Sequence, residues 1–145
     1  MVKRGKFWTS GFARATCRGI QILFVALFFT LQSFGQDIQV TARVDSNNIL
    51  VGDWLKLHLE ARHAENVAII FPAIADSLEG FEIVKRESPV LQKSNQQVLE
   101  SATFIITAFD TGTYVIPPLT FQYKLPGDAA QHSAETSPIA VFVHS

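Results

Sequence analysis

Apolar and polar residues alternate one by one over three long stretches of the chain. Apolar side chains occupy every second position from Ile38 to Val44 and again from Leu55 to Ala61. The segment from Gln97 to Ala108 has the same period over a greater length. Successive side chains of a β-strand point to opposite faces, so this pattern predicts strands with one buried face.

Shorter apolar runs predict further strands. The run Val67–Phe71 is continuous, rich in β-branched residues and followed by Pro72, which favours a strand buried on both faces. Phe81–Val84 and Ile139–Val143 are also predicted strands. The segment from Tyr114 to Tyr123 is interrupted by Pro117-Pro118, and proline cannot donate to a sheet ladder, so an exposed edge or a bulge is expected there.

Clusters of turn-forming residues separate these runs: Asp45 to Asn48, Ala73 to Gly80, Asp110 to Thr113 and Leu125 to Ser137. No segment shows a sustained helical period of 3.6 residues. The pattern therefore predicts an all-β fold, an immunoglobulin-like β-sandwich of seven or eight short strands with Greek-key connections. A β-barrel is the alternative architecture.

The first 35 residues have a different composition. Residues 1–19 carry five basic residues and no acid, and the apolar run Ile20–Leu31 follows. Ser33 and Gly35 suit the −3 and −1 positions of a signal-peptidase site. The run of 12 residues is shorter than the roughly 20 of a membrane-spanning helix. We therefore predict a signal-peptide helix at 1–35 and a sandwich domain at 36–145, with an uncleaved anchor as the alternative.

Removal of residues 1–35 would change the charge and cysteine content. Seven basic residues and all 13 acids would remain, a formal net charge of −6 with no basic cluster, which argues against nucleic-acid binding. The single cysteine, Cys17, precedes the apolar run, so it does not fit a lipoprotein site and would be lost with the signal. The remaining chain would have no disulfide.

Asp110-Thr111-Gly112 spells the catalytic tripeptide of aspartic proteases. A retroviral-type enzyme of this class pairs two chains so that two carboxylates share a proton. Such an enzyme needs most of its fold, including a glycine-containing bracing segment, after this loop, but the only later glycine is Gly127. The same letters fit a sandwich corner, in which the Tyr114 hydroxyl bonds to the backbone upstream, Gly112 allows positive φ and Asp110 accepts local N–H groups.

Other chemistry-bearing residues are scattered. His58 and His63 are five apart, which places them on opposite faces of a strand; the remaining histidines are His132 and His144. An acidic loop lacks the regular spacing of a calcium site and contains Asp76, Glu79 and Glu82. Four aromatic residues are candidates for a sugar-binding platform: Trp54, Phe71, Phe81 and Tyr123. We predict no catalytic, cofactor-binding or metal-binding residues.

Three blocks carry a family resemblance. They read QVTARVDSNNILVGD at 39–53, FPAIADSLEGFEIV at 71–84 and ITAFDTGTYVIPPLTFQY at 106–123. The chain resembles the N-terminal region of BatD, the "oxygen tolerance" family, in its Bacteroidetes-like form. The resemblance implies a periplasmic, sandwich-rich protein without catalytic residues. Members are usually several times longer and end in a membrane-spanning helix.

The resemblance also implies partners. BatD-like proteins are encoded beside Bat proteins that carry von Willebrand A domains or tetratricopeptide repeats, and beside a MoxR-type ATPase. We therefore expect a non-enzymatic, secreted protein-interaction module, periplasmic or membrane-associated, with a part in aerotolerance or envelope complex assembly. A secreted carbohydrate- or surface-binding sandwich is the alternative. A retropepsin-like protease that uses Asp110 is the remote one.

Overall fold

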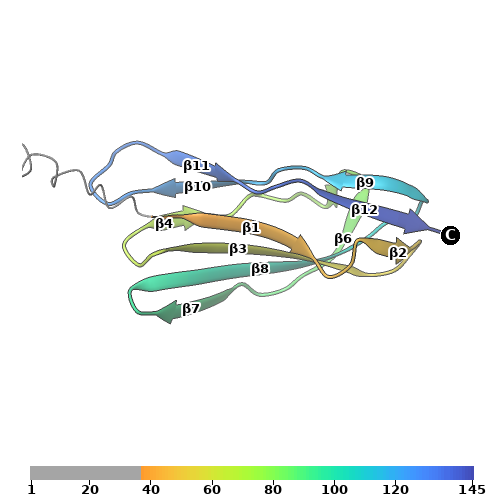
Figure 1. Ribbon diagram of the computed structural model, residues 1–145, viewed down its shortest axis with the longest axis horizontal. Coiled ribbons are helices and arrows are strands. Elements are labelled where there is room, and N and C mark those ends of the chain that lie inside the picture. The colour runs from red at the N-terminus through yellow and green to blue at the C-terminus, as the bar shows by residue number, and fades with distance from the viewer. Residues whose placement is uncertain (1–36) are drawn as a thin grey trace, which may run out of the picture. The chain divides into compact units, whose positions relative to one another are not determined.

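The computed structural model describes residues 37–145 (Figure 1). The predicted signal helix, its cleavage site and Cys17 lie outside the described residues. Within 37–145 the chain forms β-strands and no helix. In the described range, therefore, no helix is long and apolar enough to cross a membrane.

The larger sheet is built around the two longest strands. Its strand order is β1 (Gln39–Val44), β3 (Leu55–Ala64), β8 (Gln97–Thr107), β6 (Phe81–Arg86) and β5 (Ser77–Leu78). A further strand, β7 (Val90–Ser94), pairs with the first half of β8, while β6 pairs with its second half. All these pairs are antiparallel.

The opposing layer consists of two three-stranded sheets. One has the order β11 (His132–Glu135), β10 (Thr120–Lys124) and β4 (Ala68–Ile70), and the other β2 (Asn48–Leu50), β12 (Ile139–His144) and β9 (Gly112–Ile116). The two share one hairpin, because Ile116 faces Ile139 and Thr120 faces Glu135 in the same register. The predicted interruption at Pro117-Pro118 divides this hairpin.

The core lies between the two layers. Every second residue of β3 is fully buried, namely Leu55, Leu57, Leu59 and Ala61. From the opposing layer Ile116, Phe121 and Val141 meet them in one cluster. The ring of Phe121 is also 4.9 Å from that of Phe71, centroid to centroid. This packing joins the two layers into a sandwich.

The strand order is that of the immunoglobulin fold. The sheet β1-β3-β8-β6/β7 corresponds to the arrangement of strands A, B, E and D, and the opposing layer to C, F and G. β2 leaves the first layer and runs parallel to β12 in the second. The prediction of an all-β, immunoglobulin-like sandwich is therefore confirmed.

Two expectations at the strand level are wrong. Val67–Phe71 is not buried on both faces: Val67 is buried, but Ile70 is 57% exposed. The reason is that β4 pairs only with β10, at the edge of its sheet. The regions expected to be turns or loops also contain strands, namely β2, β5 and β11, and β7 lies in a segment for which no strand was predicted. These strands have two to five residues and depend on pairing with distant segments.

Candidate functional site

The turn that follows β8 is a tyrosine corner. The Tyr114 hydroxyl donates a 3.0 Å hydrogen bond to the backbone oxygen of Asp110. Gly112 between them has a φ of 151°, in the region that favours glycine. The Tyr114 ring lies 5.2 Å from that of Phe81, a fully buried core residue. The corner prediction is confirmed, and the contact with Phe81 anchors it to the core.

The Asp110 side chain plays no part in this corner. It is exposed, and its carboxylate has no hydrogen-bond partner within residues 37–145. The expectation that it accepts local N–H groups is therefore wrong, because the backbone oxygen, not the carboxylate, takes the hydrogen bond. The preceding Phe109 is 59% exposed at the same turn. The DTG tripeptide thus lies at a solvent-facing end of the sandwich.

The histidines lie apart. His58 and His63 are on opposite faces of β3, as predicted: His58 bonds Thr103 Oγ1 at 3.0 Å on the outer face, and His63 is 3% exposed on the inner face. His132 lies 2.8 Å from Asp128 Oδ2. Among residues 37–145 no three histidines, acids or cysteines gather as metal ligands would.

Sequence reasoning missed one polar arrangement in the core. His63 Nδ1 lies 2.8 Å from the Ala64 oxygen, which fixes the ring. Its buried Nε2 lies 3.4 Å from Glu100 Oε1 but makes no hydrogen bond within the described chain. Glu100 reaches this position because it pairs with Ala61 on the inner face of the sheet. The signal available in the sequence was two polar residues at inward positions of the strand pattern.

The acidic loop is organised by an arginine. Arg86 donates to the backbone oxygens of Ile74 and Ala75, both at 3.0 Å, and to Asp76 Oδ1 at 3.2 Å. The backbone of Asp76 also accepts from Ile83 N–H at 3.0 Å. These contacts hold the loop against β6. The positively charged Arg86 guanidinium therefore binds three oxygen atoms of this loop.

The four aromatic candidates do not form one surface. Trp54 is 69% exposed, whereas Phe81 is fully buried in the core. Phe71, directly after β4, and Tyr123, on β10, are half-buried. Phe71 packs on Phe121, and Tyr123 stacks on His132. The expectation that Phe81 lines a sugar platform is wrong, because its side chain fills the inner face of β6.

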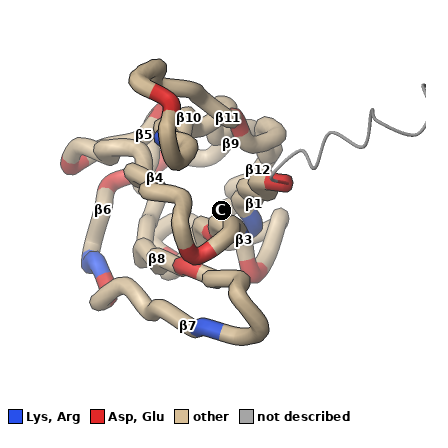
Figure 2. The backbone as a smooth tube through the Cα atoms, turned by 90° about the vertical axis from the view of Figure 1, so that its left-hand side faces the viewer, with Lys and Arg blue, Asp and Glu red and all other residues tan. Residues whose placement is uncertain are grey.

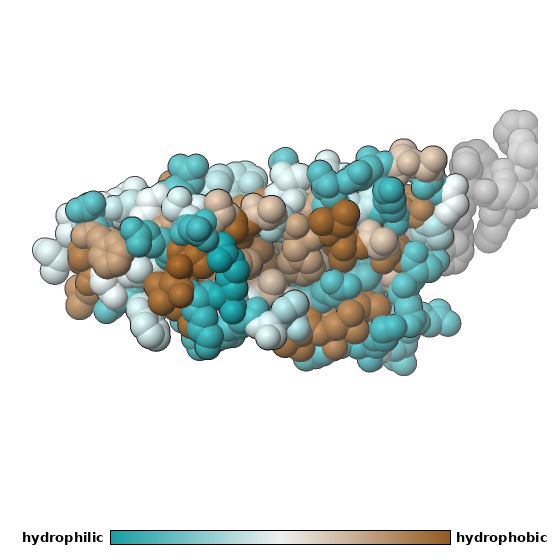
Figure 3. All heavy atoms as spheres, turned by 180° about the vertical axis from the view of Figure 1, so that it is seen from behind, coloured by the Kyte–Doolittle hydropathy of each residue, from teal (hydrophilic) through white to brown (hydrophobic). Residues whose placement is uncertain are grey.

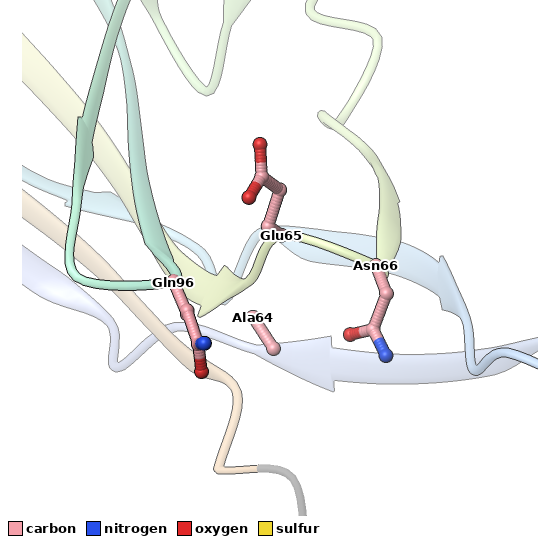
Figure 4. Close-up of a pocket in the computed structure, with 4 residues that line it drawn as sticks. All are labelled: Ala64, Glu65, Asn66 and Gln96. Atoms are coloured by element: carbon pink, nitrogen blue, oxygen red, sulfur yellow. The ribbon is translucent and has the colours of Figure 1, made fainter.

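A polar hollow of about 580 Å³ lies where two turns meet (Figure 4). Its lining includes Ala64, Glu65, Asn66 and Gln96. The Glu65 N–H donates to the Gln96 oxygen at 3.0 Å, which joins the turn after β3 to the tip of the β7–β8 hairpin. Figure 4 shows Gln96 and Asn66 directed to one side and Glu65 to the other. The side-chain amides of Asn66 and Gln96 therefore line the hollow.

Glu65 is directed to Lys93 instead, at 2.7 Å between Oε1 and Nζ. The hydrogen bond from Lys93, and then its positive charge, lower the pKa of Glu65 below its ordinary value. This pair links β7 to the turn that follows β3.

Large apolar side chains are exposed on the strands at the sheet margins. Ile70 on β4, Val84 on β6 and Val90 and Leu91 on β7 are each 44–57% exposed. Figure 3 shows that hydrophobic areas alternate with polar ones on the face of the molecule that it presents. Exposed apolar side chains mark an interaction surface where a partner covers several of them together, whereas single ones are common on any protein surface.

The comparisons with known proteins agree with the fold. A family model described as the BatD DUF11 like domain matches residues 42–143. The match begins in β1 and ends in β12, so it covers nearly all of the sandwich. No individual curated protein matches the chain. Because the family model covers more than half of its residues, the chain belongs to the BatD family.

Proposed function

We propose that this BatD-type domain acts as a non-catalytic protein-interaction module in the bacterial envelope. The observation that carries the proposal is the exposure of Ile70, Val84, Val90 and Leu91 on strands β4, β6 and β7. Exposed aliphatic side chains on a sandwich margin lose contact with water when a partner covers them, which favours association. The domain therefore binds partner proteins and does not convert a substrate.

The family suggests the compartment and the class of partner. The module acts in the periplasm, after export directed by the N-terminal segment. Its partners are Bat-type proteins with von Willebrand A domains or tetratricopeptide repeats, beside a MoxR-type ATPase. The complex contributes to aerotolerance or to envelope assembly. The net charge of −6 of residues 37–145 suits a soluble envelope domain and disfavours nucleic acid.

Crosslinking in the source bacterium tests this proposal. The full chain, with a C-terminal affinity tag, is crosslinked in cells, and the recovered proteins are identified by mass spectrometry. The control is an exported β-sandwich of unrelated sequence with the same tag. Enrichment of von Willebrand A or tetratricopeptide proteins over the control supports the proposal. Recovery of the same proteins with both baits, or fractionation of the chain with the cytoplasm, contradicts it.

Trp54 supports a second candidate function, carbohydrate binding. Its side chain is 69% exposed, and exposed aromatic rings stack on sugars. A glycan array probed with the chain and with Trp54→Ala tests this candidate. Binding that Trp54→Ala abolishes would favour it over the docking module. The protease interpretation is tested by comparing the parent chain with Asp110→Asn at acid pH. We expect neither protein to cleave a peptide substrate.

A further inference from the structure

Strand β7 is the most exposed strand of the described chain. All five of its residues are exposed, whereas β9, of equal length, buries Ile116. β7 pairs with β8 along one side, and no described strand pairs with its other side. Figure 2, which looks along the molecule, shows β7 at the outer rim, away from the opposing layer. This strand therefore combines two exposed faces with an open edge.

The hairpin geometry identifies which backbone groups face the open edge. Asn95 and Gln96 form a two-residue turn with φ of 47° and 66°, the signature of a type I′ hairpin. Ser94 and Gln97 then form the closing hydrogen-bonded pair, and the pattern alternates along the strand. Leu91 and Lys93 consequently direct their N–H and C=O groups outward. Within residues 37–145 nothing bonds to these outward groups.

The side chains leave this edge accessible. Edge strands commonly carry a lysine that blocks pairing with another chain. Here Lys93 is held by Glu65 at 2.7 Å, across the end of the sandwich. Leu91 shares the inner face of the sheet with Glu100 and Ala61, yet it is 54% exposed while Ala61 is fully buried. Leu91 is therefore an apolar side chain beside the open edge, and no opposing layer covers it.

The other margins are less suited to pairing. β5 has two residues and β4 has three, and Pro72 follows β4 closely. β9 is flanked by Gly80, which packs against the ring of Tyr114. β1 lies beside β11 and β12, so that side of the sandwich is closed.

We propose that the open edge of β7 binds an extended segment of a partner protein as an added β-strand. This inference rests on the proposed function and names the surface that performs it. The outward backbone groups supply the main-chain hydrogen bonds, and an apolar residue of the segment packs beside Leu91. Alternate residues of the segment fall on the same face as Leu91, so its sequence alternates apolar and polar residues.

The net charge of the described residues favours a different protein, rather than a second copy of this chain, as the partner of β7. The described residues carry a net charge of −6, so two copies repel each other. Three of their seven basic residues, Lys85, Arg86 and Lys93, lie on β6 and β7. Figure 2 shows basic positions along this margin. Lys93 pairs with Glu65 and Arg86 pairs with Asp76, so among these three residues Lys85 is the one that an acidic residue of the extended segment can pair with.

A peptide selection with amide exchange tests the site. The full chain is used to select from random 12-residue peptides displayed on phage, and a selected peptide is added to the isotope-labelled chain. NMR hydrogen exchange should show the Leu91 and Lys93 amides exchanging rapidly in the free chain and slowly with peptide bound. The Gln92 amide, which faces β8, should be protected in both states. The selected peptides should alternate apolar and polar residues, with acids among the polar ones.

Two variants probe the edge directly. Leu91→Pro removes an outward N–H without removing a bond to β8, and Leu91→Lys places a charge at the edge. Each should weaken peptide binding at least about tenfold with a retained fold, read from the NMR spectrum. The matched control is Phe142→Lys, because Phe142 is 43% exposed on β12, which is paired on both sides. This control should bind as the parent does.

Three outcomes would overturn the strand-addition site. The first is protection at β4 or β9 instead of β7, and the second is a concentration-dependent dimer that protects Leu91 and Lys93 without peptide. The third is the failure of any peptide to protect β7. If crosslinking still recovers Bat-type proteins in that case, the proposed function stands and only the site is wrong.

Discussion

Gly80 lies directly against the ring of Tyr114. A Cβ atom on Gly80 would stand 2.5 Å from Tyr114 Cε1 and 2.8 Å from Cδ1. Gly80 belongs to the turn between β5 and β6, and Tyr114 belongs to the corner that begins β9. This contact joins two segments that are distant in the sequence, and it requires the absence of a side chain at residue 80.

Gly80→Ala should therefore be strongly destabilising. The φ of 91° is unfavourable for alanine, and the added methyl would overlap the tyrosine ring. We expect a loss in the free energy of unfolding of more than about 2 kcal/mol, measured by urea denaturation. Gly127→Ala is the matched control, since its φ is 77° but nothing lies within 4 Å of the added Cβ. Equal losses in the two variants would show that the tyrosine contact is unimportant.

Tyr114→Phe removes the hydroxyl that bonds to Asp110. The free energy of unfolding should fall by about 0.5–1.5 kcal/mol, the net value of a typical hydrogen bond. Thermal and urea unfolding measure this loss. Tyr123→Phe serves as the control, because no hydrogen bond of the Tyr123 hydroxyl is present among the described residues. An unchanged melting curve for Tyr114→Phe would remove the energetic role of the corner.

Gln96→Gly should stabilise the protein. Gln96 occupies the second position of the β7–β8 turn with φ of 66°, where glycine has no steric penalty. The gain should be about 0.5–1 kcal/mol in the free energy of unfolding. Gln92→Gly, within β7, should instead be destabilising. A loss of stability in Gln96→Gly would contradict this prediction. It would mean that the glutamine side chain stabilises the fold by more than its positive φ destabilises it.

Thr107→Val tests a buried hydroxyl. Thr107 is 4% exposed, and its Oγ1 has no hydrogen-bond partner within the described residues. Replacing the hydroxyl with a methyl group of similar size removes an unsatisfied polar atom. The free energy of unfolding should rise by about 1 kcal/mol. Thr113→Val, at an exposed position of β9, should change it little; a destabilised Thr107→Val would reveal an unseen partner for the hydroxyl.

Lys93→Met should raise the pKa of Glu65. Lys93 lowers this pKa through its hydrogen bond and then its charge. A carboxylate with a lowered folded-state pKa stabilises the fold above the ordinary value of 4.5, and this contribution is lost as pH falls below that value. Carbon-detected NMR titration of Glu65 measures the shift. Lys124→Met is the control, and an unmoved Glu65 titration in Lys93→Met would contradict the pairing.

The local pattern determined much of the fold. Alternation from Leu55 to Ala61 identified a strand with one buried face, and every inward residue of it is fully buried. The Asp110–Tyr114 turn was also predictable, because a corner depends on residues only four apart. The three blocks shared with BatD indicated the family, and the family match over residues 42–143 confirms it.

Only the tertiary structure decided which strands have open edges. The run Val67–Phe71 has the composition of a buried strand, but β4 lies at a sheet margin and exposes Ile70. Strand β7 could not be identified from VLQKS alone, because its pairing with β8 depends on the two-residue turn and its exposure on the absence of a covering layer. Alternation along a strand reports which face is buried, but pairing along its edges depends on where distant segments lie.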